Sequence, residues 1–509
     1  MYNSCYTCRR RRIECQMAQP PCTKCKKAGI ECFQKRPLRW VQGAEFRGKA
    51  KKRASGNASS VGSVAELDSG TTSTTLVSTG INGGTQAPRG YLSTRPTEFD
   101  AGVSNPVPSI PSNPGDPSSS SLNRASQYYL YYYSKCICKL FIMHDSNRNP
   151  LRNLIPASLN QPVLLNSILA LSARHMENAG QSFQARVTTS PNALWFKYKA
   201  IQGLSQALND ASLCRQDTTV ASAFLLIFLD LLESGSDKWD VHLEGIKRLI
   251  AEVQPPSLAG TQQDLSQTVQ GLRDFISRQI YLIDTLGATF TRPRLLSDST
   301  SLQQSWIRLQ QSVDQSYLGC PEYLLDVLRS FSVYRDILAS PEPIDEIVFH
   351  SYIQQASSVL ESTKEFDCYA WASSLPQSHL QDIQKLYTLA QSYKIGSLIY
   401  GRRVFDALVA NNTTSQDDLV RELIGIIDAL KTDEALFKCI LWPMFVAGLE
   451  AQEQTQRDFV IGCLDKFWFE TKCVNVVNAG NILRKFWKQD CQTSWIFNIG
   501  QLERDWLLI

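Results

Sequence analysis

The sequence has few histidines and no long apolar run, and these shortages exclude several classes of protein. Only five of its 509 residues are histidine, and the first of them, His144, lies far from the amino-terminal cysteines. No apolar leader follows Met1, so we expect a reducing compartment and no disulfides. The longest mostly apolar stretch, Val220–Leu229, is about half of the roughly 20 residues that a membrane span needs. It predicts a buried helix, and we expect no membrane partner.

Common catalytic motifs are also missing. The chain has no Gly-x-Ser-x-Gly elbow, no His-Glu-x-x-His pair and no Asp-rich calcium loop. Gly43–Lys49 imitates a phosphate-binding loop, but Ala50 stands where a hydroxyl would hold magnesium. Arg174 and His175 resemble active-site residues, although such residues are more often satisfied core groups. We expect no enzyme and no catalytic residues, and an enzyme in the carboxyl-terminal region is the weakest alternative.

Charge and composition divide the chain into three regions. Residues 1–53 hold 15 Lys and Arg against three Asp and Glu, a net charge of +12, whereas the remainder carries −8. A basic head on an acidic body predicts a polyanionic partner for the head alone. In residues 54–126, Ser, Thr, Gly and Pro fill 40 of 73 positions, which is typical of a disordered linker. We therefore expect domains at 1–40 and 127–509, joined by a basic segment and linker at 41–126.

The region after residue 127 has helical periodicity, and alternating strand patterns are rare. Asn160 and Pro162 precede apolar residues spaced three or four apart, and a similar pattern follows Ser378. Ser415 and Asp418 resemble a capping box before a third such run. The fold class is therefore predicted as mostly α: a small cysteine cluster, a linker and a large all-α domain.

Six cysteines follow one another in a duplicated pattern. The unit is Cys-x2-Cys-x6-Cys, and it occurs twice, at Cys5, Cys8, Cys15, Cys22, Cys25 and Cys32. A Cys-x2-Cys pair places two thiolates on one zinc ion. Two tetrahedral zinc ions need eight ligand positions, and no histidine lies nearby, so two thiolates must bridge. The pseudo-symmetry points to Cys5 and Cys22 as the bridges. A disulfide knot conflicts with the missing leader, and one zinc with two spare thiols leaves the duplication unexplained.

This segment resembles the fungal binuclear zinc cluster DNA-binding domain over residues 4–36. The resemblance rests on the cysteine spacing, the basic run Arg9–Arg12, Pro20 in the joining loop and Gly29 before the last cysteine. It implies two zinc ions and a helix whose end reads a CGG triplet in double-stranded DNA. It also implies regulation of transcription by RNA polymerase II in the nucleus.

The resemblance assigns roles to the basic residues. By position, Arg12 is the base-reading residue, Arg11 is its neighbour at the groove, and Arg9 holds phosphate. Arginine is suited to bidentate contact with guanine, which agrees with the first assignment. The lysines of the second half are candidates for backbone phosphate contact; they are Lys24, Lys26 and Lys27. Glu14 departs from the family, which usually has a basic residue there, and a carboxylate near phosphate weakens binding.

Residues 128–253 look like the helical regulatory domain that follows this cluster in many fungal regulators. The matching stretches are Asn149–Arg152, Leu169–His175, Trp239–Gly245 and, beside the cluster, Arg36–Trp40. We expect Trp239, His242 and Gly245 to pack helices together. The alternative function is a sensor whose helical domain binds a small effector. No heptad pattern follows the cluster, so a monomer and a homodimer through the helical domain both stay open.

Two further segments have the composition of recognition signals. A basic cluster before the linker predicts nuclear import or extra phosphate contacts; it comprises Arg47, Lys49, Lys51, Lys52 and Arg53. The segment from Asp505 to Ile509 mixes an acid with bulky apolar residues. Contact with a coactivator or corepressor is one interpretation, and a packed or frayed terminus is the favoured one.

Overall fold

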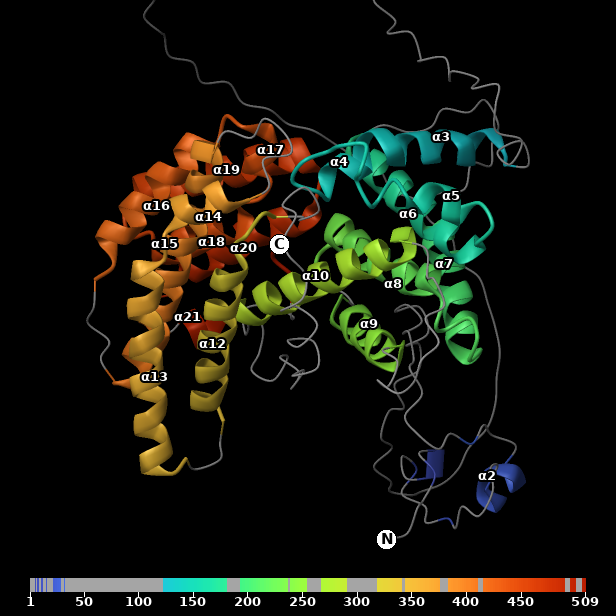
Figure 1. The fold of residues 1–509 in the computed structure, drawn as a ribbon, viewed down its shortest axis with the longest axis horizontal. Coiled ribbons are helices and arrows are strands. Elements are labelled where there is room, and N and C mark those ends of the chain that lie inside the picture. Colours follow the sequence, from blue (N-terminus) through green and yellow to red (C-terminus); the bar gives the residue numbers. More distant parts are fainter. Residues whose placement is uncertain are drawn as a thin grey trace, which may run out of the picture. The chain divides into compact units, whose positions relative to one another are not determined.

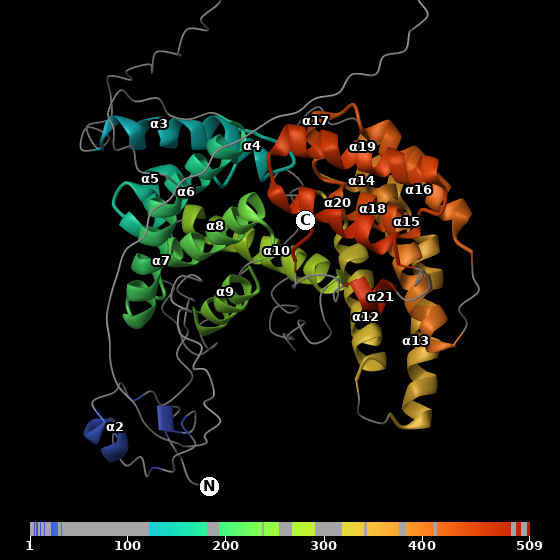
Figure 2. The same ribbon diagram turned by 180° about the vertical axis from the view of Figure 1, so that it is seen from behind.

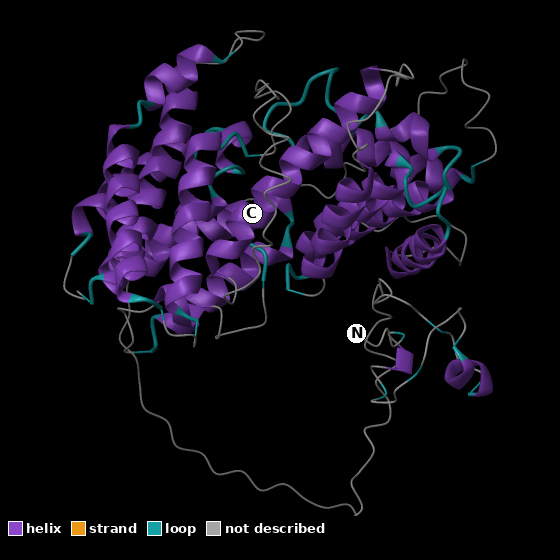
Figure 3. Ribbon diagram, turned by 60° about the horizontal axis from the view of Figure 1, so that its bottom comes forward, coloured by secondary structure: helices purple, strands orange, loops and turns teal. Residues whose placement is uncertain are grey.

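The sequence folds into helices in the computed structural model (Figure 1). The structure describes residues 5, 7–8, 11, 15, 22–28, 32, 122–180, 193–236, 239–253, 267–290, 318–340, 344–375, 383–410, 415–489, 495–499 and 506–509. The predicted linker lies outside these residues up to 121, as do the basic cluster Arg47–Arg53 and the loop Gly43–Lys49. The last three residues of the predicted linker, 124–126, belong instead to the first turn of α3. Within them every regular element is a helix, and no strand occurs (Figure 3). The predicted mostly α fold is therefore confirmed.

The helices have the following bounds: α2 Thr23–Lys27, α3 Arg124–Tyr132, the π-helix η3 Tyr133–Ile137, α4 Cys138–Leu140, α5 Leu154–Ser158, α6 Pro162–Asn178, α7 Ala193–Asn209, α8 Asp217–Glu233, α9 Trp239–Val253, α10 Gln267–Phe290, α12 Glu322–Leu338, α13 Glu346–Glu365, α14 Cys368–Ser374, α15 Ile383–Leu408, α16 Asp417–Leu430, α17 Glu434–Phe437, α18 Leu441–Glu450, α19 Gln454–Thr471, α20 Val474–Phe486 and α21 Trp495–Asn498. Among the described residues, no helix has both the length and the apolar character needed to cross a bilayer.

Helix α8 lies at the centre of the first group of helices. It packs against α5, α6, α7, α9, α10 and α20, and every residue from Thr219 to Leu232 is buried (Figures 1 and 2). A helix that is apolar all round is stable only when neighbours cover all of its faces. The buried helix predicted at Val220–Leu229 is therefore confirmed. Asp230, which is also buried, lies 3.6 Å from Lys197 Nζ and 3.8 Å from His242 Nε2.

Helix α15 lies at the centre of the second group and contacts α12, α13, α14, α16 and α18. Gly401 lets the ring of Phe331 on α12 approach its backbone so closely that an added Cβ would overlap the ring. A buried ion pair joins α15 to α18, because Arg403 donates two hydrogen bonds to Glu450, at 2.7 and 2.6 Å. Glu450 also accepts a hydrogen bond from Trp495 Nε1 at 2.7 Å, so both oxygens of this buried carboxylate have donors.

Helix α10 connects the two groups, since it contacts α8 and α9 on one side and α12 on the other. Its buried residue Asp284 accepts hydrogen bonds from Lys247 of α9 and, at 2.9 Å, from Arg329 of α12. Removal of one member would leave a buried charge without a partner, which is costly. This charged cluster therefore fixes how α9 and α12 sit against α10.

The segment Trp506–Ile509 fills the core between several of these helices. All four residues are buried, and the Trp506 ring is stacked on Phe290 with centroids 5.8 Å apart. Phe445 of α18 meets the same ring edge-on, and the N–H of Leu507 donates to the carbonyl of Gly235 at 2.6 Å. Of the packed and frayed forms that the sequence left open, the packed one is therefore confirmed for residues 506–509.

Helix boundaries agree with the sequence pattern in one case and differ in another. Helix α6 begins at Pro162 as predicted, with proline at the position where its missing N–H costs nothing. The capping box predicted at Ser415 and Asp418 is wrong. Gln416 is the N-cap of α16, and its side chain points inward to donate to the carbonyl of Ile399 at 3.3 Å. Burial of this glutamine moves the helix start past Ser415, whose hydroxyl instead contacts Asp417.

Candidate metal centre and DNA-binding surface

The six amino-terminal cysteines form two overlapping sets of sulfur atoms. One set contains Cys5, Cys8, Cys15 and Cys22, and the other contains Cys5, Cys22, Cys25 and Cys32; within each set the sulfurs lie within 4.8 Å of one another. Each set offers four thiols, the number that a tetrahedral zinc ion takes. Cys5 and Cys22 belong to both sets, and their Sγ atoms are 3.7 Å apart. None of the six cysteines takes part in a disulfide, so no disulfide competes for their sulfurs.

The hydrogen bonds around the sulfurs repeat with the sequence duplication. The N–H of Cys5 donates to Cys15 Sγ at 3.3 Å, and the N–H of Cys22 donates to Cys32 Sγ at 3.3 Å. Likewise, Cys5 Sγ accepts from the N–H of Cys8 and Cys22 Sγ accepts from the N–H of Cys25. The two halves therefore share one local geometry, with Cys5 and Cys22 in equivalent places.

Backbone donors favour the thiolate form, which is the form that binds metal. The hydrogen bond from the Cys25 N–H is the largest cause that lowers the pKa of Cys22 to about 6. Cys22 is also the N-cap of α2, because its sulfur occupies the position of a capping side chain. This second role of Cys22 was not predicted, although the Cys-x2-Cys spacing places its sulfur where a helix cap would lie. The donor set, its spacing and its polarity thus fit zinc.

Four predicted DNA-contacting residues can be located. Arg11 is exposed, three residues from Cys8, whose carbonyl accepts from the Arg11 N–H at 3.0 Å. The other three, Lys24, Lys26 and Lys27, are exposed around α2. Arg9, Arg12 and Glu14 lie outside the described residues. The described part of the cluster therefore presents four cations to solvent, next to buried sulfurs.

Comparison with known proteins agrees with this geometry. Residues 3–41 match the family model of the fungal Zn(2)-Cys(6) binuclear cluster domain, a DNA-binding module that holds two zinc ions. Residues 128–509 match the fungal specific transcription factor domain. Since the second match covers more than half of the chain, the protein belongs to this family of zinc-dependent DNA-binding transcription regulators. Membership indicates a regulator rather than an enzyme.

A curated relative extends along nearly the whole chain. It is the acriflavine sensitivity control protein acr-2 of Neurospora crassa, which is 22% identical over 557 aligned residues, covering 95% of this chain and 92% of the relative. No solved structure matches the chain. The similarity therefore includes the cluster, the intervening segment and the helical region together.

The residues that resembled an active site make hydrogen bonds to neighbouring side chains within the fold. His175 Nδ1 is 2.8 Å from the hydroxyl of Tyr132, and burial lowers the pKa of His175 to about 4. Arg174 donates to Glu233 at 3.1 Å and to Glu177 at 2.9 Å. Trp239 and His242 are buried, as expected for residues that pack helices. These groups form structural contacts between helices rather than a catalytic arrangement.

Proposed function

We propose that this protein is a nuclear regulator of RNA polymerase II transcription that recognises CGG-type half-sites through its zinc cluster. One zinc ion is held by the set Cys5, Cys8, Cys15 and Cys22, and the other by the set Cys5, Cys22, Cys25 and Cys32. Cys5 and Cys22 are the bridging ligands. The observation that supports this most strongly is the overlap of the two sulfur sets at these two residues. When bound, the ions hold the two halves together, and the chain's own cations contact the DNA.

The cations divide into a reading group and a positioning group. Arg12 contacts guanine O6 and N7 in the major groove, and Arg11 lies beside it. Arg9 and the three exposed lysines of α2 neutralise phosphates, which sets orientation without reading sequence. Glu14 adds a negative charge near the same surface and weakens phosphate contact. Domains at 1–40 and 127–509, joined by 41–126, separate this head from the helical body.

In vitro selection of bound DNA by the full-length, zinc-loaded protein tests the proposal. We expect CGG triplets, and pairs at fixed spacing would indicate a dimer. Arg12→Ala should weaken binding by about 1–3 kcal/mol and relax preference at one base pair. Lys26→Ala is the matched control, because loss of a phosphate contact weakens all sequences equally. Unchanged affinity and preference in Arg12→Ala would overturn the assignment.

Nuclear import is assigned to the basic cluster before the intervening segment. Its cations are Arg47, Lys49, Lys51, Lys52 and Arg53. Replacing all five with glutamine in a fluorescent fusion should shift the protein to the cytoplasm while DNA binding in vitro persists. A fusion that still accumulates in the nucleus would contradict this role.

A further inference from the structure

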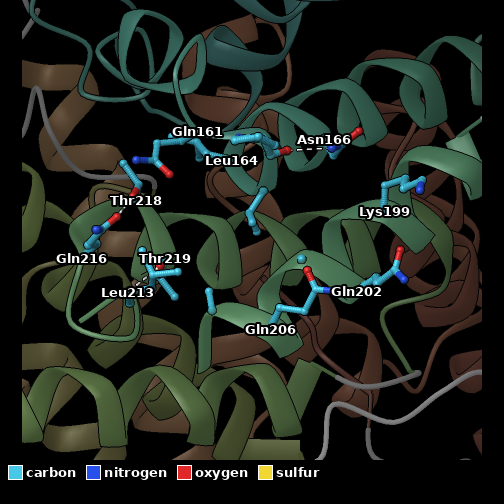
Figure 4. Close-up of a pocket in the computed structure, with 14 residues that line it drawn as sticks. Gln161, Leu164, Asn166, Lys199, Gln202, Gln206, Leu213, Gln216, Thr218 and Thr219 are labelled. Carbon is cyan, nitrogen blue, oxygen red and sulfur yellow. Dashed lines mark hydrogen bonds between the residues drawn. The ribbon is translucent and has the colours of Figure 1, made fainter. Parts of the chain in front are cut away.

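A hollow of about 380 Å³ lies where α6, α7 and the turn before α8 meet (Figure 4). This volume falls within the range of small-molecule sites. Lys199, Gln202 and Gln206 of α7 line one side, and Gln161 and Asn166 line the opposite side. The buried side chains of Leu164 and Ala207 add an apolar surface, and none of the described lining residues is a carboxylate.

Several polar groups in this lining are available to a ligand. Gln202 and Gln206 are exposed and Gln161 is half-buried, and none of the three side chains hydrogen-bonds another described residue. Lys199 has no carboxylate partner among the described residues, and its ammonium lies 5.7 Å from the centroid of the Trp195 ring. Each amide can donate and accept, whereas Lys199 supplies one positive charge. The lining therefore suits a ligand with one negative charge and neutral hydrogen-bonding groups.

The walls of the hollow are held in place without a ligand. Gly203 of α7 lies so close to Val163 of α6 that an added Cβ would approach Val163 Cγ2 to 2.8 Å. The turn before α8 is fixed by Thr219, whose hydroxyl donates to the carbonyl of Leu213 at 2.7 Å. Asp210 accepts from the Ser212 N–H at 2.7 Å at the start of the same turn. A site formed in advance loses less conformational entropy on binding.

We propose that this hollow binds a small carboxylic acid that carries an amide group and a short apolar side chain, the chemical class of N-acylated amino acids. The carboxylate pairs with Lys199, the ligand amide bonds the glutamine side chains, and the apolar part lies on Leu164 and Ala207. The site is distinct from the zinc cluster, and its occupancy does not depend on the proposed DNA sequence.

Saturation-transfer NMR on the full-length, zinc-loaded protein tests this site. The probes are a panel of N-acetyl amino acids and the corresponding N-acetyl amino acid amides, which lack the negative charge. We expect at least one acid to bind saturably and its amide to bind roughly tenfold more weakly, the effect of one charge-assisted contact. Lys199→Met should remove that difference, and Gln206→Trp, which fills the hollow, should abolish binding.

Two matched variants control for nonspecific effects. Lys488→Met removes an exposed lysine outside the hollow, and Ser205→Trp adds the same bulk at an exposed position of α7 that does not line it. Both should bind like the unmodified protein. Absence of saturable binding by every acid, or equal binding by Gln206→Trp and the unmodified protein, would overturn the proposal. Mobility shifts on the same preparations report on the DNA-binding proposal separately.

Discussion

Replacement of Cys22, a proposed bridging ligand, distinguishes a shared two-metal cluster from two independent zinc sites. Cys22 belongs to both sulfur sets, whereas Cys25 belongs to one. Cys22 also caps α2 by accepting from the N–H of Cys25 at 3.4 Å. Serine caps helices well but is not among the usual zinc ligands. Cys22→Ser therefore removes a metal ligand and keeps the cap.

We expect Cys22→Ser to lose both zinc ions and Cys25→Ser to keep one. A structural zinc contributes about 10–16 kcal/mol to the folding of small zinc domains. The segment from Cys5 to Cys32 is shorter than the roughly 40 residues below which a domain usually needs metal or disulfides. Loss of both ions should therefore unfold the head and abolish DNA binding. Loss of one leaves the set that contains Cys8 and Cys15 complete.

Zinc content by mass spectrometry under native conditions, after dialysis against buffered zinc, measures the outcome. Cys214→Ser is the matched control, because Cys214 lies in the helical region, away from both sulfur sets. This variant should retain two zinc ions. Equal zinc content in Cys22→Ser and Cys25→Ser would refute the bridging role. A head that binds DNA with its zinc exhaustively removed would refute the metal's part in folding.

Three further outcomes follow from the structure. Changing Lys24, Lys26 and Lys27 together to glutamine should reduce the slope of log affinity against log salt by about 2.7, measured by fluorescence anisotropy, and an unchanged slope would exclude phosphate contact. Gly401→Ala should destabilise the protein by about 1–3 kcal/mol in urea denaturation, because its Cβ overlaps Phe331. Gly462→Ala, with nothing within 4 Å, should stabilise it by about 0.5–1 kcal/mol, and equal effects would contradict the packing. Burial lowers the pKa of His175 to about 4 and of His242 to about 3. The unfolded chain therefore binds more protons between about pH 4 and 6.5, and stability should fall as pH decreases through this window. The slope from each histidine is up to about 1.4 kcal/mol per pH unit, and a flat profile in urea denaturation would contradict it.

Much of the cluster could be predicted because its chemistry is local. Ligand counting pointed to Cys5 and Cys22, and the two sulfur sets overlap at those residues. The central helix α8 was also predictable, since a helix apolar on all sides has to be buried. In both cases the signal lies within about 30 consecutive residues or fewer.

Features that depend on distant residues could not be predicted. Serine is a common N-cap, so Ser415 looked like the start of α16. The helix begins after Gln416 instead, because the Gln416 side chain donates to the carbonyl of Ile399 on another helix. The hollow combines Gln161 and Lys199, which are far apart in the chain and look like ordinary surface residues. The periodicity of a single helix does not indicate which of its surface residues will face a second helix.

The burial of Trp506–Ile509 sets an order of events during synthesis of the chain. Gly235, Phe290 and Phe445 leave the ribosome well before these four residues, so their part of the core stays open until residue 509 has emerged. The two cysteine sets, by comparison, lie entirely between Cys5 and Cys32. Segments fold in the order in which their partners become available. The cysteine cluster can therefore fold on the nascent chain before the core around Trp506–Ile509 is complete.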